Sequence, residues 1–177
     1  MSDVNFEDYI VDIPDYPEPG VVFKDVTPLF ADAEGLKACV DNMVEHFKDM
    51  GITKVLGAEA RGFLIGAPVA YGLDAGFVPA RKPGKLPREV YSESYALEYG
   101  TDELQIHKDS INPGDKVLII DDLVATAGTS TACARLVERA GGEVMAFAYI
   151  LELAFLNPRE VVSREFDQEF YSLIKVQ

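Results

Sequence analysis

The stretch over residues 116–153 constrains the fold more than any other part of the chain. Two near-continuous apolar runs, residues 116–122 (KVLIIDD) and 143–153 (EVMAFAYILEL), flank a helix-like segment over residues 128–140. A strand with consecutive apolar residues is typical of a strand buried on both faces. The two runs therefore predict neighbouring strands in a parallel sheet that is covered by helices.

The same alternation of strand and helix extends along the chain. Strands are expected over residues 52–58 and 76–81 with a helix over 61–73 between them, and an amphipathic helix is expected over 33–50. The 177 residues contain no internal repeat, low-complexity tract or linker, so a single domain over residues 1–177 is expected. The predicted fold class is α/β, with a central parallel sheet flanked by helices.

Residues 82–100 (KPGKLPREVYSESYALEYG) interrupt this alternation of strand and helix. The segment is longer than a plain connection, and loops of this length inside compact domains are usually functional lids or disordered insertions. It also gathers two lysines and an arginine in a chain whose net charge is −14. The alternative is an exposed β-hairpin without a role, which this local positive charge makes less favourable.

The composition narrows the classes of partner. A net charge of −14 argues against nucleic acid and against an anionic membrane surface, because both repel a strongly acidic protein. No apolar run reaches the ~18 residues of a membrane helix, and the N-terminus lacks the features of a signal peptide. His46 and His107 have no second kind of metal ligand nearby, which argues against zinc. Cys39 and Cys133 are expected to be buried thiols. A cytoplasmic enzyme or binding protein fits these features.

Residues 117–130 (VLIIDDLVATAGTS) carry the strongest chemical signal. Unpaired N–H groups and the helix dipole make a helix start suited to phosphate, and small residues let the ligand come close. Neither a Walker loop nor a dinucleotide fingerprint is present. Asp121 and Asp122 precede the loop, and carboxylates suit ribose hydroxyls or Mg²⁺. A sugar 5-phosphate would satisfy both parts, whereas the alternative is an acid pair that only caps a strand end.

The stretch VLIIDDLVATAGT resembles the phosphoribosyl pyrophosphate motif of the type I phosphoribosyltransferases. Further stretches that carry the resemblance lie at residues 16–29, 57–70, 78–89 and 95–100. The resemblance implies the type I phosphoribosyltransferase fold, with a flexible lid hairpin at about residues 82–100 and a small hood. It also implies transfer of the phosphoribosyl group of phosphoribosyl pyrophosphate to a nucleobase, with Mg²⁺ as the cofactor and a homodimer as the assembly. The combination of RKPGKLP with LEYG favours adenine as the base, with AMP and pyrophosphate as products.

The resemblance also assigns roles to the residues of the motif. The 5′-phosphate is expected to bind in the loop of Ala125, Thr126, Ala127, Gly128 and Thr129. Asp121 and Asp122 are expected to bind the ribose hydroxyls, directly or through Mg²⁺, and to stabilise positive charge that develops on the ribose. The family usually has two glycines where this chain has Ala127 and Gly128. If position 127 needs a positive φ, alanine costs on the order of 1 kcal/mol there, and otherwise it costs little.

The remaining assignments concern the pyrophosphate, the base and the lid. The cations expected near the pyrophosphate are Arg61, Arg81, Lys82 and Lys85. Glu98 is expected to exchange a proton with the base, and segment 82–100 is expected to close and exclude water. The residues expected around the base are Val22, Phe23 and Lys24, with Leu153 on its other face. Plain alternatives are a surface salt bridge for Arg61, an exposed acid for Glu98, and core packing for Phe23 and Leu153.

The sequence is compatible with two other functions. One is a regulator that binds phosphoribosyl pyrophosphate without catalysis, although such a protein normally carries a basic DNA-binding segment, which this chain lacks. The other is a sister transferase for another nucleobase. Only the base pocket separates that enzyme from one that acts on adenine, and Lys24 together with the LEYG stretch favours adenine.

Overall fold

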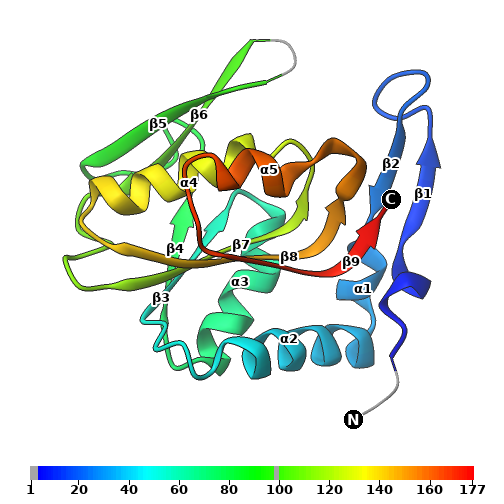
Figure 1. Cartoon of the computed structure of the whole chain (residues 1–177), viewed down its shortest axis with the longest axis horizontal. Helices are drawn as coiled ribbons and strands as arrows, with labels where there is room; N and C mark the ends of the chain where they lie inside the picture. The colour runs from blue at the N-terminus through cyan, green and yellow to red at the C-terminus, as the bar shows by residue number, and fades with distance from the viewer. Residues whose placement is uncertain (1–3, 98–99) are drawn as a thin grey trace.

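A five-stranded parallel sheet forms the centre of the protein in a computed structural model that describes residues 4–97 and 100–177. Its strands, in order across the sheet, are β4 (Gly76–Ala80), β3 (Lys54–Ala58), β7 (Lys116–Val124), β8 (Glu143–Leu153) and β9 (Glu169–Val176). Figure 1 shows helices on both faces of this sheet. The predicted α/β class is therefore confirmed.

The chain crosses the sheet in two opposite directions from its middle. From β3 it passes through helix α3 (Arg61–Gly72) to the edge strand β4. From β7 it passes through α4 (Gly128–Arg139) to β8 and through α5 (Pro158–Ser163) to β9. Strands β3 and β7 are direct neighbours, so the direction reverses between them. In doubly wound sheets, ligands bind outside the carboxyl ends of the strands at such a reversal.

Both faces of the sheet are buried, as the apolar runs predict. Along β7, Val117 and Ile119 pack into the core beneath α4 and α5, whereas Leu118 and Ile120 pack into the core beneath α3 and α2 (Ala33–Phe47). Successive side chains of a strand point to opposite faces, so a strand covered on both sides needs apolar residues at consecutive positions. Figure 1 shows α4 and α5 on one side of the sheet and α2 and α3 on the other.

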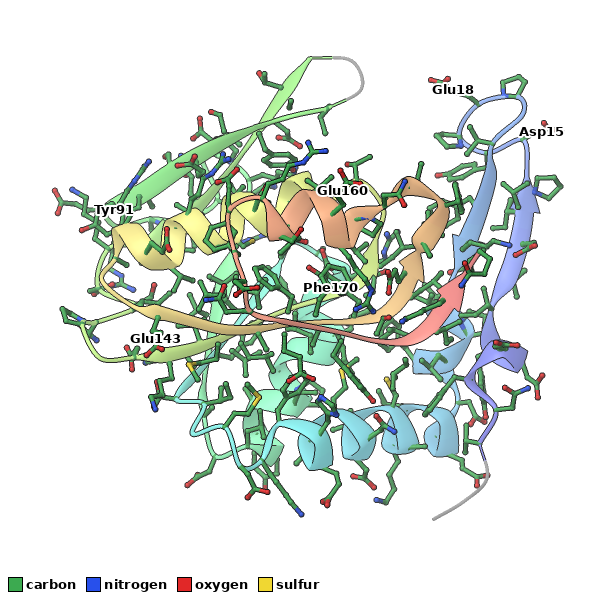
Figure 2. The ribbon with its side chains drawn as sticks, in the orientation of Figure 1. Asp15, Glu18, Tyr91, Glu143, Glu160 and Phe170 are labelled. Carbon is green, nitrogen blue, oxygen red and sulfur yellow. The ribbon has the colours of Figure 1, made fainter. Side chains whose placement is uncertain are left out.

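Two antiparallel hairpins lie outside the central sheet. The hairpin of β5 (Val90–Ala96) and β6 (Thr101–His107) extends beyond α4 in Figure 1. The hairpin of β1 (Val11–Pro14) and β2 (Val22–Asp25) is drawn at the other side of the molecule from the β5–β6 hairpin in Figure 1 and corresponds to the expected small hood. Figure 2 shows Asp15 and Glu18 at the tip of this second hairpin. The short elements are η1 (Phe6–Tyr9), α1 (Thr27–Ala31) and η2 (Ala154–Leu156).

The boundaries differ from the expected ones in informative places. The expected lid segment, residues 82–100, contains only the first strand of its hairpin, because β6 continues the pairing from Ala96↔Thr101 to Val90↔His107. Helix α2 ends at Phe47, three residues before the expected end, and Gly51 then turns with a φ of 67°. The C-terminal pair α5 and β9 has no counterpart in the expected elements. Helix α5 has only 6 residues, too few for a helical repeat to be recognised.

The two cysteines are buried free thiols, as expected. Burial raises the pKa of the Cys39 thiol to about 12 and raises that of Cys133 as well, so both thiols stay protonated near neutral pH. In the described part of the chain, every helix is too short or too polar to span a bilayer.

Candidate active site

A cavity of about 540 Å³ opens at the carboxyl ends of β3 and β7, where the chain direction reverses. Residues 59–61 after β3 form one wall, and residues 121–130, from the end of β7 into the first turn of α4, form another. Lys82, Tyr95 and Leu104 complete the lining. The cavity therefore brings together the acid pair, the expected phosphate loop and two of the expected cations, Arg61 and Lys82.

The loop after β7 enters helix α4 through a left-handed residue. Ala127 has φ 64° and ψ 12°, and no side chain caps the first turn of the helix. The first backbone N–H groups of a helix have no intrahelical partner, and the residues of this first turn, Gly128, Thr129 and Ser130, line the cavity. An anion bound in this cavity would accept those hydrogen bonds and interact with the positive end of the helix dipole.

Ala127 has a left-handed backbone conformation at a position where the family usually has glycine. The position does require a positive φ, which costs a residue with a Cβ atom roughly 1 kcal/mol or more. Its methyl group is buried in the core beneath α4, which offsets part of that cost. The next residue, Gly128, has a different role: a Cβ atom there would lie 3.2 Å from Cδ2 of Tyr95. Gly128 therefore allows the β5–β6 hairpin to approach the loop.

The acid pair is held by the segment that follows β3. The buried Asp122 carboxylate accepts a hydrogen bond from Nε of Arg61 over 2.5 Å. Oδ1 of Asp121 accepts the backbone N–H of Asp122 over 2.9 Å. A Cβ atom on Gly62 would lie 2.8 Å from Oδ1 of Asp121, so glycine at this position lets the start of α3 come close. Both carboxylates thus belong to one rigid junction between β7 and α3.

The two carboxylates interact electrostatically. Burial, and then the neighbouring charge of Asp122, raise the pKa of Asp121 well above its ordinary value, while the backbone N–H of Asp122 and the positive charge of Arg61 oppose the increase. Removing a carboxylate from water disfavours its charged form, and a second carboxylate nearby does the same. Hydroxyl donors or a cation bound beside Asp121 would favour its charged form.

Arg61 connects the acid pair to the small hood. It is the first residue of α3, and about half of its side chain is exposed. Besides its ion pair with Asp122, its guanidinium carbon lies 5.6 Å from the centre of the Phe23 ring on β2. This distance is within the range of a cation–π contact. The structure therefore brings one expected base-site residue close to one expected pyrophosphate residue.

Lys82 is held between β3 and the lid hairpin. Its ammonium group contacts the carboxylate of Asp102 and the hydroxyl of Tyr95, the latter over 3.0 Å. Its backbone N–H donates to Glu59 over 2.6 Å. Burial alone lowers the pKa of Lys82, but the hydrogen bonds to Asp102 and Tyr95 raise it overall. The hydrogen bond from the Lys82 N–H, and then that from Arg81, lower the pKa of Glu59.

The other two expected cations, Arg81 and Lys85, lie outside the lining of the cavity. Arg81 forms an ion pair with Glu59 over 3.2 Å, and its Nε is buried without a hydrogen-bond partner in the described part of the chain. Lys85 is exposed and lies outside the lining of the cavity. Contact of Lys85 with a pyrophosphate therefore stays a prediction.

The residues expected around the base also lie outside the cavity lining. Val22, Phe23 and Lys24 belong to β2, and Leu153 is the last residue of β8. The Lys24 ammonium is paired with Asp12 over 2.6 Å. Their role at a base site stays a prediction. The predicted proton-transfer residue, Glu98, lies outside the described residues.

Three residues that reasoning from the sequence did not select take part in this site. Glu59 holds the backbone of Lys82, and Tyr95 and Asp102 hold its ammonium group. Glu59 directly follows the strand 54–58, which is where ligand-binding residues gather in this type of sheet, so its position was a usable signal. Asp102 became recognisable only through its pairing with Tyr95 across the hairpin.

The oxygen donors of the site suit a Mg²⁺ ion that is carried by its substrate. Within residues 4–97 and 100–177, no group of three or more His, Cys, Asp or Glu side chains could enclose a metal. Asp121 and Asp122 stand beside the phosphate loop, and Mg²⁺ commonly binds one or two carboxylates together with substrate phosphates and water. The donor set therefore fits this mode of binding, with Asp121 and Asp122 as the residues that would contact the ion.

The acid pair and the loop at the start of α4 lie together at the reversal of the sheet, and this arrangement is chemically suited to a phosphorylated ribose. The model of the phosphoribosyl transferase domain matches residues 26–167, and the chain belongs to this family. Over 145 residues it is 60% identical to the adenine phosphoribosyltransferase of Aeromonas salmonicida (strain A449), an alignment that covers 82% of this chain and 80% of that protein.

Solved structures agree with this assignment. An adenine phosphoribosyltransferase from Thermoanaerobacter pseudethanolicus is 45% identical, with a TM-score of 0.92 and coverage of 97% of this chain and 98% of the other. An adenine phosphoribosyl transferase from Trypanosoma brucei, solved in complex with AMP, pyrophosphate and ribose-5-phosphate, is 28% identical. Its TM-score is 0.88, with coverage of 96% of this chain and 77% of the other.

Proposed function

We propose that this protein transfers the 5-phosphoribosyl group of phosphoribosyl pyrophosphate to adenine, giving AMP and pyrophosphate. The observation that carries the proposal is the junction of β7 and α4, where two carboxylates and a loop of small residues line one cavity and no described side chain caps the helix that follows. The relative from Aeromonas and the two solved structures, all named as adenine phosphoribosyltransferases, support adenine as the base.

The phosphate and ribose determine how the substrate is oriented. The 5′-phosphate binds the N–H groups of residues 125–129 and the hydroxyls of Thr126 and Thr129. Asp121 and Asp122 bind the ribose hydroxyls, directly or with Mg²⁺, and stabilise the positive charge that develops on the ribose. Mg²⁺, when bound, supplies positive charge that neutralises the phosphate oxygens. Holding C1′ in place converts an effectively bimolecular reaction into an intramolecular one.

The reaction forms a bond between C1′ and a ring nitrogen of adenine as the bond from C1′ to pyrophosphate breaks. Arg61, Arg81, Lys82 and Lys85 bind the negative charge of the leaving pyrophosphate. Glu98 exchanges the proton with the ring nitrogens of adenine. Val22, Phe23 and Lys24 lie against one face of the base, and Leu153 lies against the other.

The wider organisation follows the same proposal. Residues 1–177 act as one domain, and residues 82–100 belong to a lid that excludes water from the activated sugar. We expect the enzyme to act in the cytoplasm as a homodimer, without nucleic acid or a membrane as partner. Size-exclusion chromatography with light scattering measures the assembly directly.

An assay with a panel of bases tests the activity. Purified protein is incubated with labelled phosphoribosyl pyrophosphate, Mg²⁺ and each of several purines and pyrimidines, and the nucleotides formed are separated. Formation of AMP from adenine alone is expected. Nucleotide from a different base would identify a sister transferase instead. If no base yields nucleotide although the labelled sugar binds, the protein is a regulator that lacks catalysis.

A further inference from the structure

Two buried hydroxyl groups meet directly beneath the proposed phosphate loop. Tyr149 of β8 is fully buried, and its hydroxyl is hydrogen-bonded to Oγ of Ser130 over 2.6 Å. Ser130 belongs to the first turn of α4, is 5% exposed and lines the cavity. Tyr149 is also the register partner of Asp121 on the neighbouring strand. Tyr149 therefore neighbours Asp121 of the acid pair in the sheet and is hydrogen-bonded to the first turn of α4.

The buried surroundings determine which hydroxyl donates. Tyr149 is fully buried, and burial disfavours a charged phenolate, so the phenol keeps its proton. In the described part of the chain its hydroxyl has no other partner. If Ser130 donated to it, the phenolic proton would stay buried without an acceptor, and such an unmade hydrogen bond is costly. The phenol therefore donates and Oγ of Ser130 accepts.

This direction leaves the proton of Ser130 free. Among the described residues Ser130 makes no second side-chain hydrogen bond, whereas the hydroxyl of Thr131 donates to the carbonyls of Ala127 and Gly128 over 3.2 and 3.0 Å. Serine has one proton to donate, and a phosphate group offers acceptor oxygens. Because Ser130 lines the cavity, its proton has an acceptor once a phosphate occupies the loop.

We propose that Ser130 is a further residue that binds the 5′-phosphate, and that Tyr149 is a positioning residue that turns the Ser130 hydroxyl toward it. The inference rests on the proposed function, which supplies the phosphorylated sugar. Neither residue lies within the stretch VLIIDDLVATAGT that marks the phosphoribosyl pyrophosphate motif. The pair adds a hydroxyl donor to the loop beyond Thr126 and Thr129.

Three variants test the pair: Ser130→Ala, Tyr149→Phe and the double variant. Ser130→Ala is expected to raise the KM for phosphoribosyl pyrophosphate about tenfold, the size expected for a lost hydrogen bond to a charged group. Tyr149→Phe keeps the serine but loses its orientation, so an increase of about threefold is expected. The double variant is expected to match Ser130→Ala. Because both residues act on the phosphate, kcat and the KM for adenine are expected to change less than about twofold.

Matched controls and a direct binding measurement complete the test. Ser163→Ala and Tyr171→Phe remove hydroxyls that donate to the carbonyl of Glu160 and to Oδ1 of Asn42, away from the cavity, and are expected to leave every constant unchanged. Calorimetric titration with ribose 5-phosphate and with ribose measures two affinities, and their difference gives the contribution of the phosphate group to binding. Only the affinity for ribose 5-phosphate is expected to fall in the Ser130 and Tyr149 variants.

Several outcomes would overturn the inference. An unchanged KM for phosphoribosyl pyrophosphate in Ser130→Ala or in the double variant, with or without a lower Tm, limits the pair to a structural role. The double variant removes both hydroxyls and leaves no buried donor unpaired, so it keeps the test open if Ser130→Ala fails to fold. Equal effects of Tyr149→Phe with and without Ser130 show that Tyr149 does not act through the serine. Wild-type protein that forms no AMP refutes the proposed function itself, whereas active wild-type protein beside unaffected variants refutes only the role of Ser130.

Discussion

The two ends of the cavity differ in how their charges are balanced before any ligand binds. At the expected phosphate end, the first turn of α4 has no side-chain cap among the described residues, and its residues line the cavity. At the expected pyrophosphate end, three of the four expected cations have a carboxylate partner: Arg61 with Asp122, Arg81 with Glu59, and Lys82 with Asp102.

Under the proposed function, this difference corresponds to two ways of binding an anionic group. The phosphate end offers backbone donors fixed by a buried strand and a helix, so binding requires little rearrangement. The pyrophosphate end keeps cations in an acidic chain by pairing them internally. Binding there exchanges one carboxylate for another anion, so only the difference between the two interactions contributes to affinity.

The largest expected effect comes from the acid pair between the two ends. Asp121→Asn and Asp122→Asn each remove a charge that faces the developing positive ribose, and a loss of about 10²-fold or more in kcat is expected. Steady-state kinetics with circular dichroism separates this effect from misfolding. Asp109→Asn is the matched control, because that carboxylate pairs with Arg88 on the surface. Full activity in both acid variants would remove the acid pair from the proposed mechanism.

The exchange at the pyrophosphate end is tested by changing each partner of Lys82. Lys82→Met is expected to weaken the binding of pyrophosphate about tenfold, as for a lost charge-assisted hydrogen bond. Asp102→Asn removes the competing carboxylate and is expected to tighten it several-fold. Inhibition of AMP formation by added pyrophosphate measures both. Weaker inhibition in Asp102→Asn would mean that the carboxylate positions Lys82 and does not compete for it.

The raised pKa of Asp121 predicts a dependence on pH. Between the ordinary aspartate pKa and this higher value the folded protein binds more protons than the unfolded chain, so the free energy of unfolding falls as pH rises through that interval. Affinity for phosphoribosyl pyrophosphate with Mg²⁺ is expected to rise over the same interval, because the charged carboxylate binds better. Urea denaturation and KM, measured as the pH is raised from the ordinary aspartate pKa, check both trends. Asp121→Asn is expected to abolish them, and a variant that retains them would assign the titration to another group.

The smallest expected effect concerns the strained turn at the phosphate end. Ala127→Gly relieves the left-handed conformation, and the free energy of unfolding is expected to rise by about 0.5–1 kcal/mol after the lost burial of a methyl group. Affinity for ribose 5-phosphate is expected to stay within about twofold, since the N–H group is retained. Ala67→Gly, in the exposed interior of α3, is the matched control and is expected to destabilise by about 1 kcal/mol. A destabilised Ala127→Gly would show that the methyl contact outweighs the strain.

Local sequence patterns predicted much of the fold and part of the site. Apolar runs over 116–122 and 143–153 identified two central strands, since a strand buried on both faces is apolar at consecutive positions over most of its length. The acid pair and the small-residue loop were recognisable because they occupy consecutive positions. Asp102 and Tyr149 were not recognisable, because their partners, Lys82 and Ser130, are 20 and 19 residues away in sequence.

The order of residues by itself determined the buried strands, the helices between them and the family to which the chain belongs, because each depends on neighbouring side chains and on short motifs. Only the tertiary structure decided the left-handed turn at Ala127, the carboxylate partners of Arg61, Arg81 and Lys82, and the Tyr149–Ser130 contact. These features depend on the distance between segments that the sheet brings together. Hydrogen bonds and ion pairs form over about 3 Å, and distances of that size between remote residues are set by packing.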